Sequence, residues 1–380
     1  MKNFLFFLLF FAFSLFSCQN NKSAENKEVA TKEAMQPAEP VKWVTYKAKN
    51  NPTGKNILLV TGDEEYRSEE AMPQLAKILA NYHGFDCTVL FAQNPEKLGT
   101  IDPNYSFNIP GLEKLATADL MILFTRFRAL PNEQMQHVDN YLAAGKPLIA
   151  IRTATHAFNF KDTTHQWRHY GFNYKGEKEA WQLGFGKAVL GETWYTHHGH
   201  HKHQSTRGII APGAENHPIT NGIESGAIWG PTDVYGIRMP MPNTQSIILG
   251  QTINRAGEYD DSDPFYGLKE TDTEVATVNP VTKKPYNPND PMPPIAWTKN
   301  YQIPNGQLGQ SFTTTIGSAT DMVDEEVRRL MVNATFHLLG MEVPAKAKVD
   351  LVGTYNPSPY NFHKDEHWTK LNLQIADLVE

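Results

Sequence analysis

Four short apolar runs in the first half of the chain constrain its fold more than any other feature. They are NILLVTG (56–62), CTVLFA (87–92), DLMILFTRF (119–127) and PLIAIRT (147–153). Apolar residues at helical spacing predict helices at 69–83 and 130–145, which Gly84 and Gly145 end. Because the runs are continuously apolar, both faces of the sheet they form must be covered, as in parallel sheets. The sequence therefore predicts an α/β fold with a doubly wound, mostly parallel sheet flanked by helices.

The second half of the chain adds further elements to this pattern. They are a strand at 245–253, a hairpin of 294–301 and 307–317, and a helix at 324–340. Residues 154–243 are irregular and rich in Gly, Pro, His and Trp, and residues 255–293 predict a long loop. We expect one α/β domain over residues 51–342, followed by an extended C-terminal tail over 343–380.

The first 18 residues, MKNFLFFLLFFAFSLFSC, are typical of a processing signal. The apolar run from Leu5 to Phe16 follows Lys2 and is short for a membrane span. It ends in LFSC, which resembles a bacterial lipobox with Cys18 as the lipidated residue. The alternative is an ordinary secretory signal with a chance cysteine. We expect an exported lipoprotein, held at a membrane by its lipid and lying in the periplasm or at the cell surface.

Residues 19–50 are rich in Asn, Lys, Glu, Ala and Pro and show no periodicity, so they predict a flexible tether. After Cys18 the chain holds only Cys87, so no internal disulfide can form. Cys87 stands in an apolar run and is expected to be a small buried residue. The net charge of −6 and the lack of a basic stripe argue against a nucleic-acid partner.

Charged side chains follow three of the predicted strands. In open parallel sheets, ligands bind beyond the carboxyl ends of the strands. The candidates at those ends are Asp63, Glu64, Arg67, Arg126, Arg152 and His156. Arg152 could bind a carboxylate or stabilise an oxyanion, or instead form a structural ion pair with Asp63 or Glu64. Glu69 and Glu70, in contrast, are placed to favour the start of a helix.

The segment THHGHHKHQSTRG (196–208) holds five histidines at positions 197, 198, 200, 201 and 203. A metal site, acid/base chemistry and a solvated loop are the possible uses. Gly199 argues against a helical chelating pair, and no HExxH motif is present. Imidazole titrates near neutral pH without a cofactor. We therefore favour acid/base use by His198 and His201, which flank the glycine turn, and expect no metal and no cofactor.

Several segments together resemble the ThuA-like (trehalose utilisation) family. They are ILLVTGDEEYRSEE, LPNEQMQHVDNYLAAGKPLIAIRT, NHPITNGI, PTDVYG, PIAWTKNY and SFTTTIG with RRLMVNATFHLLGME, in that order. The resemblance implies a flavodoxin-like fold, similar to class I glutamine amidotransferases, and a role in bacterial sugar use beside dehydrogenases that make 3-keto sugars. The nucleophilic cysteine of amidotransferases is missing from AIRTATH, which excludes thiolate amide hydrolysis. Many ThuA-like chains carry histidine where this chain has Arg152, and His156 lies four residues on.

The resemblance implies a small-molecule carbohydrate as partner. We expect acid/base chemistry on a keto-sugar or glycoside, with His198 or His201 as base, Arg152 beside the oxyanion, and Glu64 or Asp233 as acid or orienting group. The expected substrate-binding residues are Asp63, Arg67, Arg126, His156, Tyr235 and Trp297. Trp297 could equally belong to the hairpin core. A non-catalytic, lipid-anchored sugar-binding protein and a metal-dependent hydrolase remain the alternatives.

Overall fold

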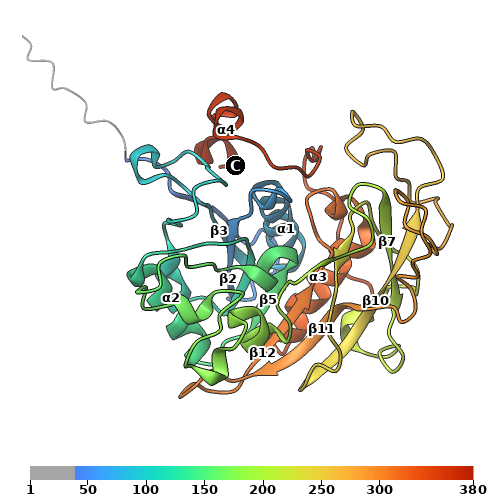
Figure 1. Cartoon of the computed structure of the whole chain (residues 1–380). Helices are drawn as coiled ribbons and strands as arrows, with labels where there is room; N and C mark the ends of the chain where they lie inside the picture. Colours follow the sequence, from blue (N-terminus) through green and yellow to red (C-terminus); the bar gives the residue numbers. More distant parts are fainter. Residues whose placement is uncertain (1–38, 380) are drawn as a thin grey trace, which may run out of the picture. The chain divides into compact units, whose positions relative to one another are not determined.

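The computed structural model describes residues 39–379. In this part of the chain, ten strands form one sheet in the order β1-β3-β2-β4-β5-β12-β11-β10-β7-β8 (Figure 1). Its parallel centre consists of β3 (Asp86–Leu90), β2 (Asn56–Gly62), β4 (Leu120–Thr125), β5 (Leu148–Ile151) and β12 (Gly309–Thr314). In chain order these strands lie 2-1-3-4-5, which is the flavodoxin-like arrangement. The predicted fold class is confirmed.

Antiparallel strands extend this parallel centre at both edges. On one side β1 (Trp43–Tyr46) pairs with β3. On the other side follow β11 (Pro294–Tyr301), β10 (Thr244–Asn254), β7 (Gln204–Ile210) and β8 (Ile228–Gly230). The predicted hairpin of β11 and β12 is confirmed, as is the strand at β10. β7 and β8 lie within residues 154–243, so the prediction that this whole segment is irregular was wrong. β7 could not be predicted as a strand, because its sequence QSTRGII has no continuous apolar run.

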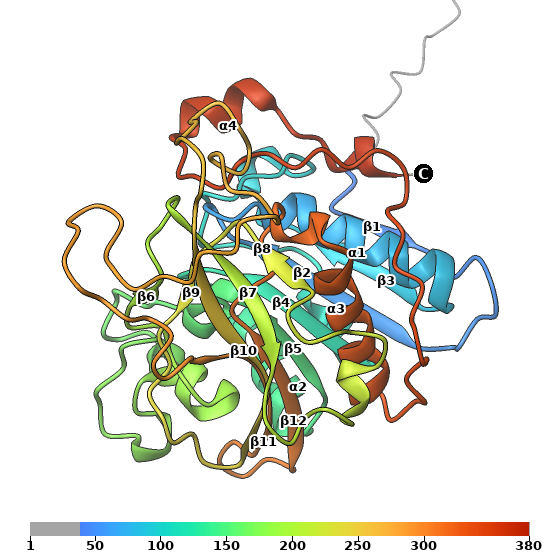
Figure 2. The ribbon, with the colours of Figure 1, turned by 90° about the vertical axis from the view of Figure 1, so that its right-hand side faces the viewer.

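Helices cover both faces of the sheet. α1 (Ser68–His83) and α3 (Glu325–Leu338) lie on one face, and α2 (Asn132–Ala143) lies on the other (Figure 2). Side chains alternate accordingly along β2: Ile57 and Leu59 join the core under α1 and α3, and Leu58 and Val60 join the core under α2. Each fully buried side chain of this kind contributes about 1.5–3 kcal/mol. This two-faced burial explains why the runs are apolar throughout.

Short helical segments connect the main elements. They are Pro95–Lys97, Leu112–Ala116, Arg152–His156, Arg168–Tyr170, Glu179–Trp181, Gly186–Leu190, Pro218–Thr220, Asp321–Val323 and Ile375–Leu378. The predicted helix stops are confirmed at α1, where Gly84 adopts a left-handed φ of 71° and its N–H bonds to Leu79 O. A two-stranded sheet of β6 (His197–His198) and β9 (Val234–Tyr235) stands apart from the large one.

The folded body is larger than the predicted domain of residues 51–342. β1 lies within the segment predicted as a tether, so the part of residues 19–50 from Trp43 to Tyr46 belongs to the sheet. The tail over 343–380 is not simply extended, because it contains α4 (Asp365–Leu371) and the fully buried Tyr360. A four-residue strand and a seven-residue helix are too short to show a reliable periodic spacing of apolar residues in the sequence.

The predicted signal segment 1–18, with Cys18, lies outside the described residues. Among residues 39–379, no helix combines the length and the apolar character that a bilayer crossing needs. Cys87 is buried with a free thiol, as expected from its place in an apolar run.

Candidate functional site

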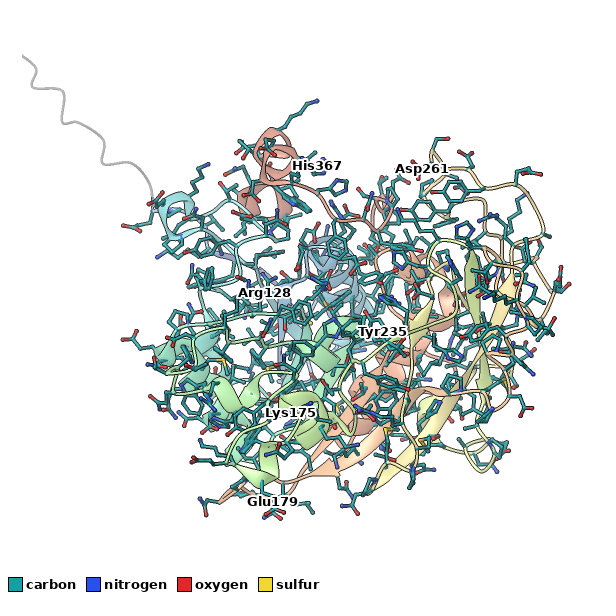
Figure 3. All side chains as sticks on the ribbon, in the orientation of Figure 1. Arg128, Lys175, Glu179, Tyr235, Asp261 and His367 are labelled. Atoms are coloured by element: carbon teal, nitrogen blue, oxygen red, sulfur yellow. The ribbon has the colours of Figure 1, made fainter. Side chains whose placement is uncertain are left out.

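The carboxyl ends of the parallel strands bring polar side chains to one edge of the sheet. β2 is followed by Glu64 and Glu65, β4 by Arg126, and β5 by Arg152. The loop before β9 adds Asp233, and Figure 3 labels Tyr235 in β9 itself. These segments are far apart in sequence, and they meet because parallel strands end together.

A buried carboxylate joins two histidines at this edge. Asp233 Oδ2 lies 2.6 Å from His197 Nδ1, and Asp233 Oδ1 lies 2.9 Å from His201 Nδ1. The Asp233 side chain is fully buried, whereas His197 and His201 keep 39% and 33% of their side-chain surface exposed. Pairing of β6 with β9 fixes this arrangement, since His197 lies opposite Tyr235 and His198 opposite Val234. The two imidazoles are therefore anchored at one nitrogen and accessible elsewhere.

The charges within this cluster set its protonation. Burial alone would raise the pKa of Asp233, but hydrogen bonds from His197 and His201 hold it below its ordinary value. Burial lowers the pKa of His197, and its hydrogen bond to Asp233 outweighs that effect, so the pKa of His197 is raised. An ionised carboxylate only accepts hydrogen bonds, so Nδ1 of each ring carries the proton. When a ring is neutral, its Nε2 is left as a base.

Glu65 is the acidic group that lies next to Nε2 of His201. Its Oε1 lies 3.7 Å from His201 Nε2, and its Oε2 lies 3.7 Å from Arg126 Nε. Burial, followed by the charge of Asp63, raises the pKa of Glu65 to about 7. A carboxyl that titrates near neutrality suits proton transfer. The sequence interpretation chose Glu64 rather than Glu65 from the same DEE triplet.

Glu64 instead forms an ion-pair network with two arginines. Its Oε1 binds Arg126 NH1, and its Oε2 lies 2.7 Å from Arg128 NH2. The Arg126 guanidinium stacks on the rings of Phe127 and Phe362 at 4.4 and 4.8 Å. Arg126 keeps 19% of its side chain exposed, so it can still reach a ligand. Arg126 thus links Glu64 to Glu65 across the edge of the sheet.

Arg152 lies at this edge but is committed to the protein itself. It is fully buried, and its φ of 46° is a left-handed conformation that costs a residue with a side chain about 1–3 kcal/mol. NH1 contacts Thr232 Oγ1 at 2.8 Å and Thr315 O at 2.9 Å, and both NH1 and NH2 lie 3.1 Å from Asp233 O. The guanidinium therefore positions the backbone of Asp233, and its complete burial keeps it from contacting a substrate.

Aromatic rings form one wall of the site. The buried His156 ring packs against Phe127, Trp194 and Tyr235 with centroids 4.9, 5.3 and 5.6 Å apart. Burial holds the pKa of His156 well below its ordinary value, so the ring is neutral. The Tyr235 ring also packs 5.7 Å from His197. The structure therefore places His156 and Tyr235 in the wall, behind the two exposed histidines.

Four residues expected at the site lie elsewhere or turn away from it. His198 follows His197 in β6, and neighbouring strand residues face opposite sides, so its Nε2 is buried without a partner among the described residues. Arg67 pairs with Glu69 and Glu70 on α1. These placements follow from local geometry that the residue types do not reveal.

Trp297 and Asp63 serve the fold itself. Trp297 is fully buried, and its Nε1 donates to Leu190 O at 2.7 Å, so it offers no ring face to a sugar. Asp63 Oδ1 accepts the backbone N–H groups of Glu65 and Tyr66, and its Oδ2 accepts from Thr153. Asp63 therefore shapes the turn that presents Glu65.

The histidine cluster also has the composition of a metal site. Ligand atoms of His197, His201 and Asp233 all lie within 4.8 Å of one another. Two imidazoles and one carboxylate suit Zn²⁺ or Fe²⁺. The sequence interpretation expected no metal, because Gly199 argues against a helical chelating pair and no HExxH motif is present. In the structure, neighbouring residues of β6 face opposite sides, so His197 rather than His198 meets Asp233 beside His201. These three residues form the chelating set.

The family model for ThuA, described as trehalose utilisation, matches residues 56–338. The chain belongs to the ThuA family. A ThuA-like protein from Bacteroides uniformis is similar to it at 16% identity, with 79% of this chain and 94% of that chain covered and a TM-score of 0.40. A ThuA-like protein from Parabacteroides merdae is similar at 13% identity, with 82% of this chain and 98% of that chain covered and a TM-score of 0.42. A search of curated proteins found no match.

In this member of the ThuA family, Arg152 occupies the turn after β5 where the amidotransferase resemblance would place a nucleophilic cysteine. The left-handed φ of 46° keeps a sharp strand-to-helix turn, but the side chain points into the protein and has no nucleophile. From this turn Arg152 fixes Asp233 through its backbone oxygen.

Asp233→Asn tests the electrostatics of this cluster. The contribution of His197, whose folded pKa is raised, is present below its unfolded value of 6.5 and lost above its folded pKa. The contribution of Asp233, whose folded pKa is lowered, is present above its unfolded value of 3.8. Urea unfolding should show a loss of about 1.5–3 kcal/mol, largest between pH 3.8 and 6.5.

The exposed Asp350→Asn is the matched control and should change stability little at any pH. A loss in Asp233→Asn that is the same at pH 5 and pH 9 would show that His197 and Asp233 do not titrate as a pair.

Proposed function

We propose that the protein is an enzyme of carbohydrate utilisation that acts on a 3-keto sugar or its glycoside by acid/base catalysis. The observation that carries this proposal is the pair of half-exposed imidazoles, His197 and His201, which Asp233 holds at Nδ1. Beside them lies the carboxyl of Glu65, whose pKa is about 7. Membership of the trehalose utilisation family supports a carbohydrate substrate. Elimination from a keto sugar needs a base, an acid and a cation, and this edge of the sheet supplies all three.

The proposed reaction begins with the proton at C2, which the 3-keto group makes acidic. His201 Nε2 removes it, and the electrons form an enediolate. The C1–O bond then breaks as the C1=C2 double bond forms, and protonated Glu65 gives its proton to the leaving oxygen. The Arg126 guanidinium stabilises the oxyanion at C3, a role that the buried Arg152 cannot take.

Glu65→Gln and His201→Asn test these roles with a 3-keto-glucoside as substrate. Each should lower kcat by about 10²–10⁴-fold, because each removes a proton-transfer group. In the unchanged protein, kcat/KM should fall above about pH 7, since Glu65 must be protonated to act as an acid and its pKa is about 7. In Glu65→Gln, this fall of kcat/KM on the alkaline side of the pH profile (the alkaline limb) should be absent.

Glu64→Gln is the comparison for this experiment, because it changes the neighbouring carboxyl and leaves Glu65 in place. It should keep the alkaline limb. Saturable binding of the keto-glucoside by calorimetry without product would instead favour the non-catalytic binding protein.

A metal-dependent hydrolase is the second candidate, and the chelating set of His197, His201 and Asp233 favours it. In that case one nitrogen of each imidazole and a carboxylate oxygen of Asp233 would hold the ion, which would supply a Lewis acid. Elemental analysis of the purified protein decides between the candidates. One equivalent of Zn²⁺ or Fe²⁺ that is lost in His197→Ala supports the hydrolase, and the acid/base proposal predicts activity that persists after chelation.

We also propose that the protein is an exported lipoprotein anchored through Cys18. The apolar N-terminal run that ends in LFSC supports this. A labelled fatty acid fed to producing cells should be incorporated into the protein and not into Cys18→Ser. Equal labelling of the two would contradict a lipid at this cysteine.

A further inference from the structure

A cavity lies at the carboxyl ends of β2 and β4, where Glu64 and Phe127 form part of its lining. It has a volume of about 600 Å³, within the range of small-molecule sites. Three segments enclose it: the loop of Asn104–Phe107, the turn of Phe127–Ala129 and the stretch Asn159–His165. β2 and β4 flank the point where the strand order reverses, which is where ligands bind in such sheets. Arg128, labelled in Figure 3, forms part of the wall.

Aromatic rings dominate the apolar part of the lining. The ring of Phe160 stacks on His165 with centroids 4.4 Å apart. Phe107 keeps 56% of its surface exposed, and Phe127 is half-buried. Exposed ring faces around a hollow suit a ligand with both apolar and polar surface, such as the C–H face and hydroxyl edge of a sugar ring.

The charged groups of the cavity lining give no surplus of positive charge for an anion, because Lys161 is followed by Asp162 and Arg128 is paired with Glu64. Each nitrogen of the Arg128 guanidinium is engaged within the protein, with Nε on Arg126 O, NH1 on Pro103 O and Tyr105 O, and NH2 on Glu64. No free guanidinium of residues 39–379 therefore faces the cavity to bind a phosphate or carboxylate. The side-chain amide of Asn159 makes no hydrogen bond within the described chain, and it offers both donors and an acceptor.

An aromatic strip connects the cavity to the histidines. From Phe127 in the cavity wall it continues to Phe172 at 4.8 Å and to Trp194 at a further 6.3 Å, and Trp194 lies 5.8 Å from His197. Phe127, Phe172 and Trp194 are all half-buried, so each keeps part of its ring exposed. The strip is longer than the footprint of a single sugar ring on a single aromatic side chain.

We propose that this cavity is a second sugar subsite, and that the substrate is a glycoside of at least two rings. One ring lies at His201 and Glu65, and the next lies on Phe127 and Phe160, with Asn159 bonding its hydroxyls. This inference rests on the proposed function for the identity of the ring that reacts. The binding of the second ring depends only on the cavity.

Calorimetric titration of the full chain with trehalose and with glucose tests the subsite directly. Trehalose should bind more tightly than glucose. Phe160→Ala and Asn159→Ala should each weaken trehalose binding about tenfold and leave glucose binding unchanged. Tyr286→Ala removes an exposed ring outside this cavity, and it should bind both sugars as the unchanged protein does.

Equal affinity for the two sugars, no saturable trehalose binding, or trehalose binding unaffected by Phe160→Ala and Asn159→Ala would each overturn the subsite. Turnover of a 3-keto methyl glucoside is measured in parallel. If that turnover persists while the subsite results fail, the proposed function stands and the subsite does not. If turnover is absent while trehalose binding responds to the variants, the subsite stands and the reaction does not.

Discussion

The candidate site depends on one buried charge, the carboxylate of Asp233. Burying an ionised carboxyl costs several kcal/mol unless other groups compensate it. His197 and His201 bind its two oxygens, and Arg152 binds its backbone carbonyl. Arg152 is itself held in a left-handed turn after β5 and contacts the ends of β9 and β12. The central strands of the sheet thus fix the position of one side chain, and that side chain orients both exposed imidazoles.

Much of the fold could be predicted from the sequence because its signals are long and repeated. The runs at β2, β4 and β5 are apolar on both faces, and Gly84 stops α1 through a left-handed φ. Membership of the ThuA family agrees with the segments quoted for it. β1 and α4 escaped prediction because few residues form them, and each is stabilised by contacts with segments distant in the chain.

The site was harder to predict, because it depends on which way individual side chains point. His198 and His197 are chemically identical and adjacent, and only the pairing of β6 with β9 decides that His197 faces Asp233. Glu64 and Glu65 differ in the same way, through a turn that Asp63 shapes. The residue types show that the end of a strand is polar. Which of these residues contact one another depends on the side of the strand that each faces and on the geometry of the turn. Arg152 has the right chemistry for an oxyanion and the wrong exposure.

Nitrogen NMR of the imidazoles tests the central claim most directly. With ¹⁵N-labelled histidine, the chemical shifts of Nδ1 and Nε2 report which nitrogen carries the proton in each neutral ring. Donation to Asp233 predicts the Nδ1–H form for both His197 and His201, with Nε2 unprotonated at high pH. Rings protonated at Nε2, or with Nδ1 shifts typical of a bound metal, would contradict an acid/base pair oriented by Asp233.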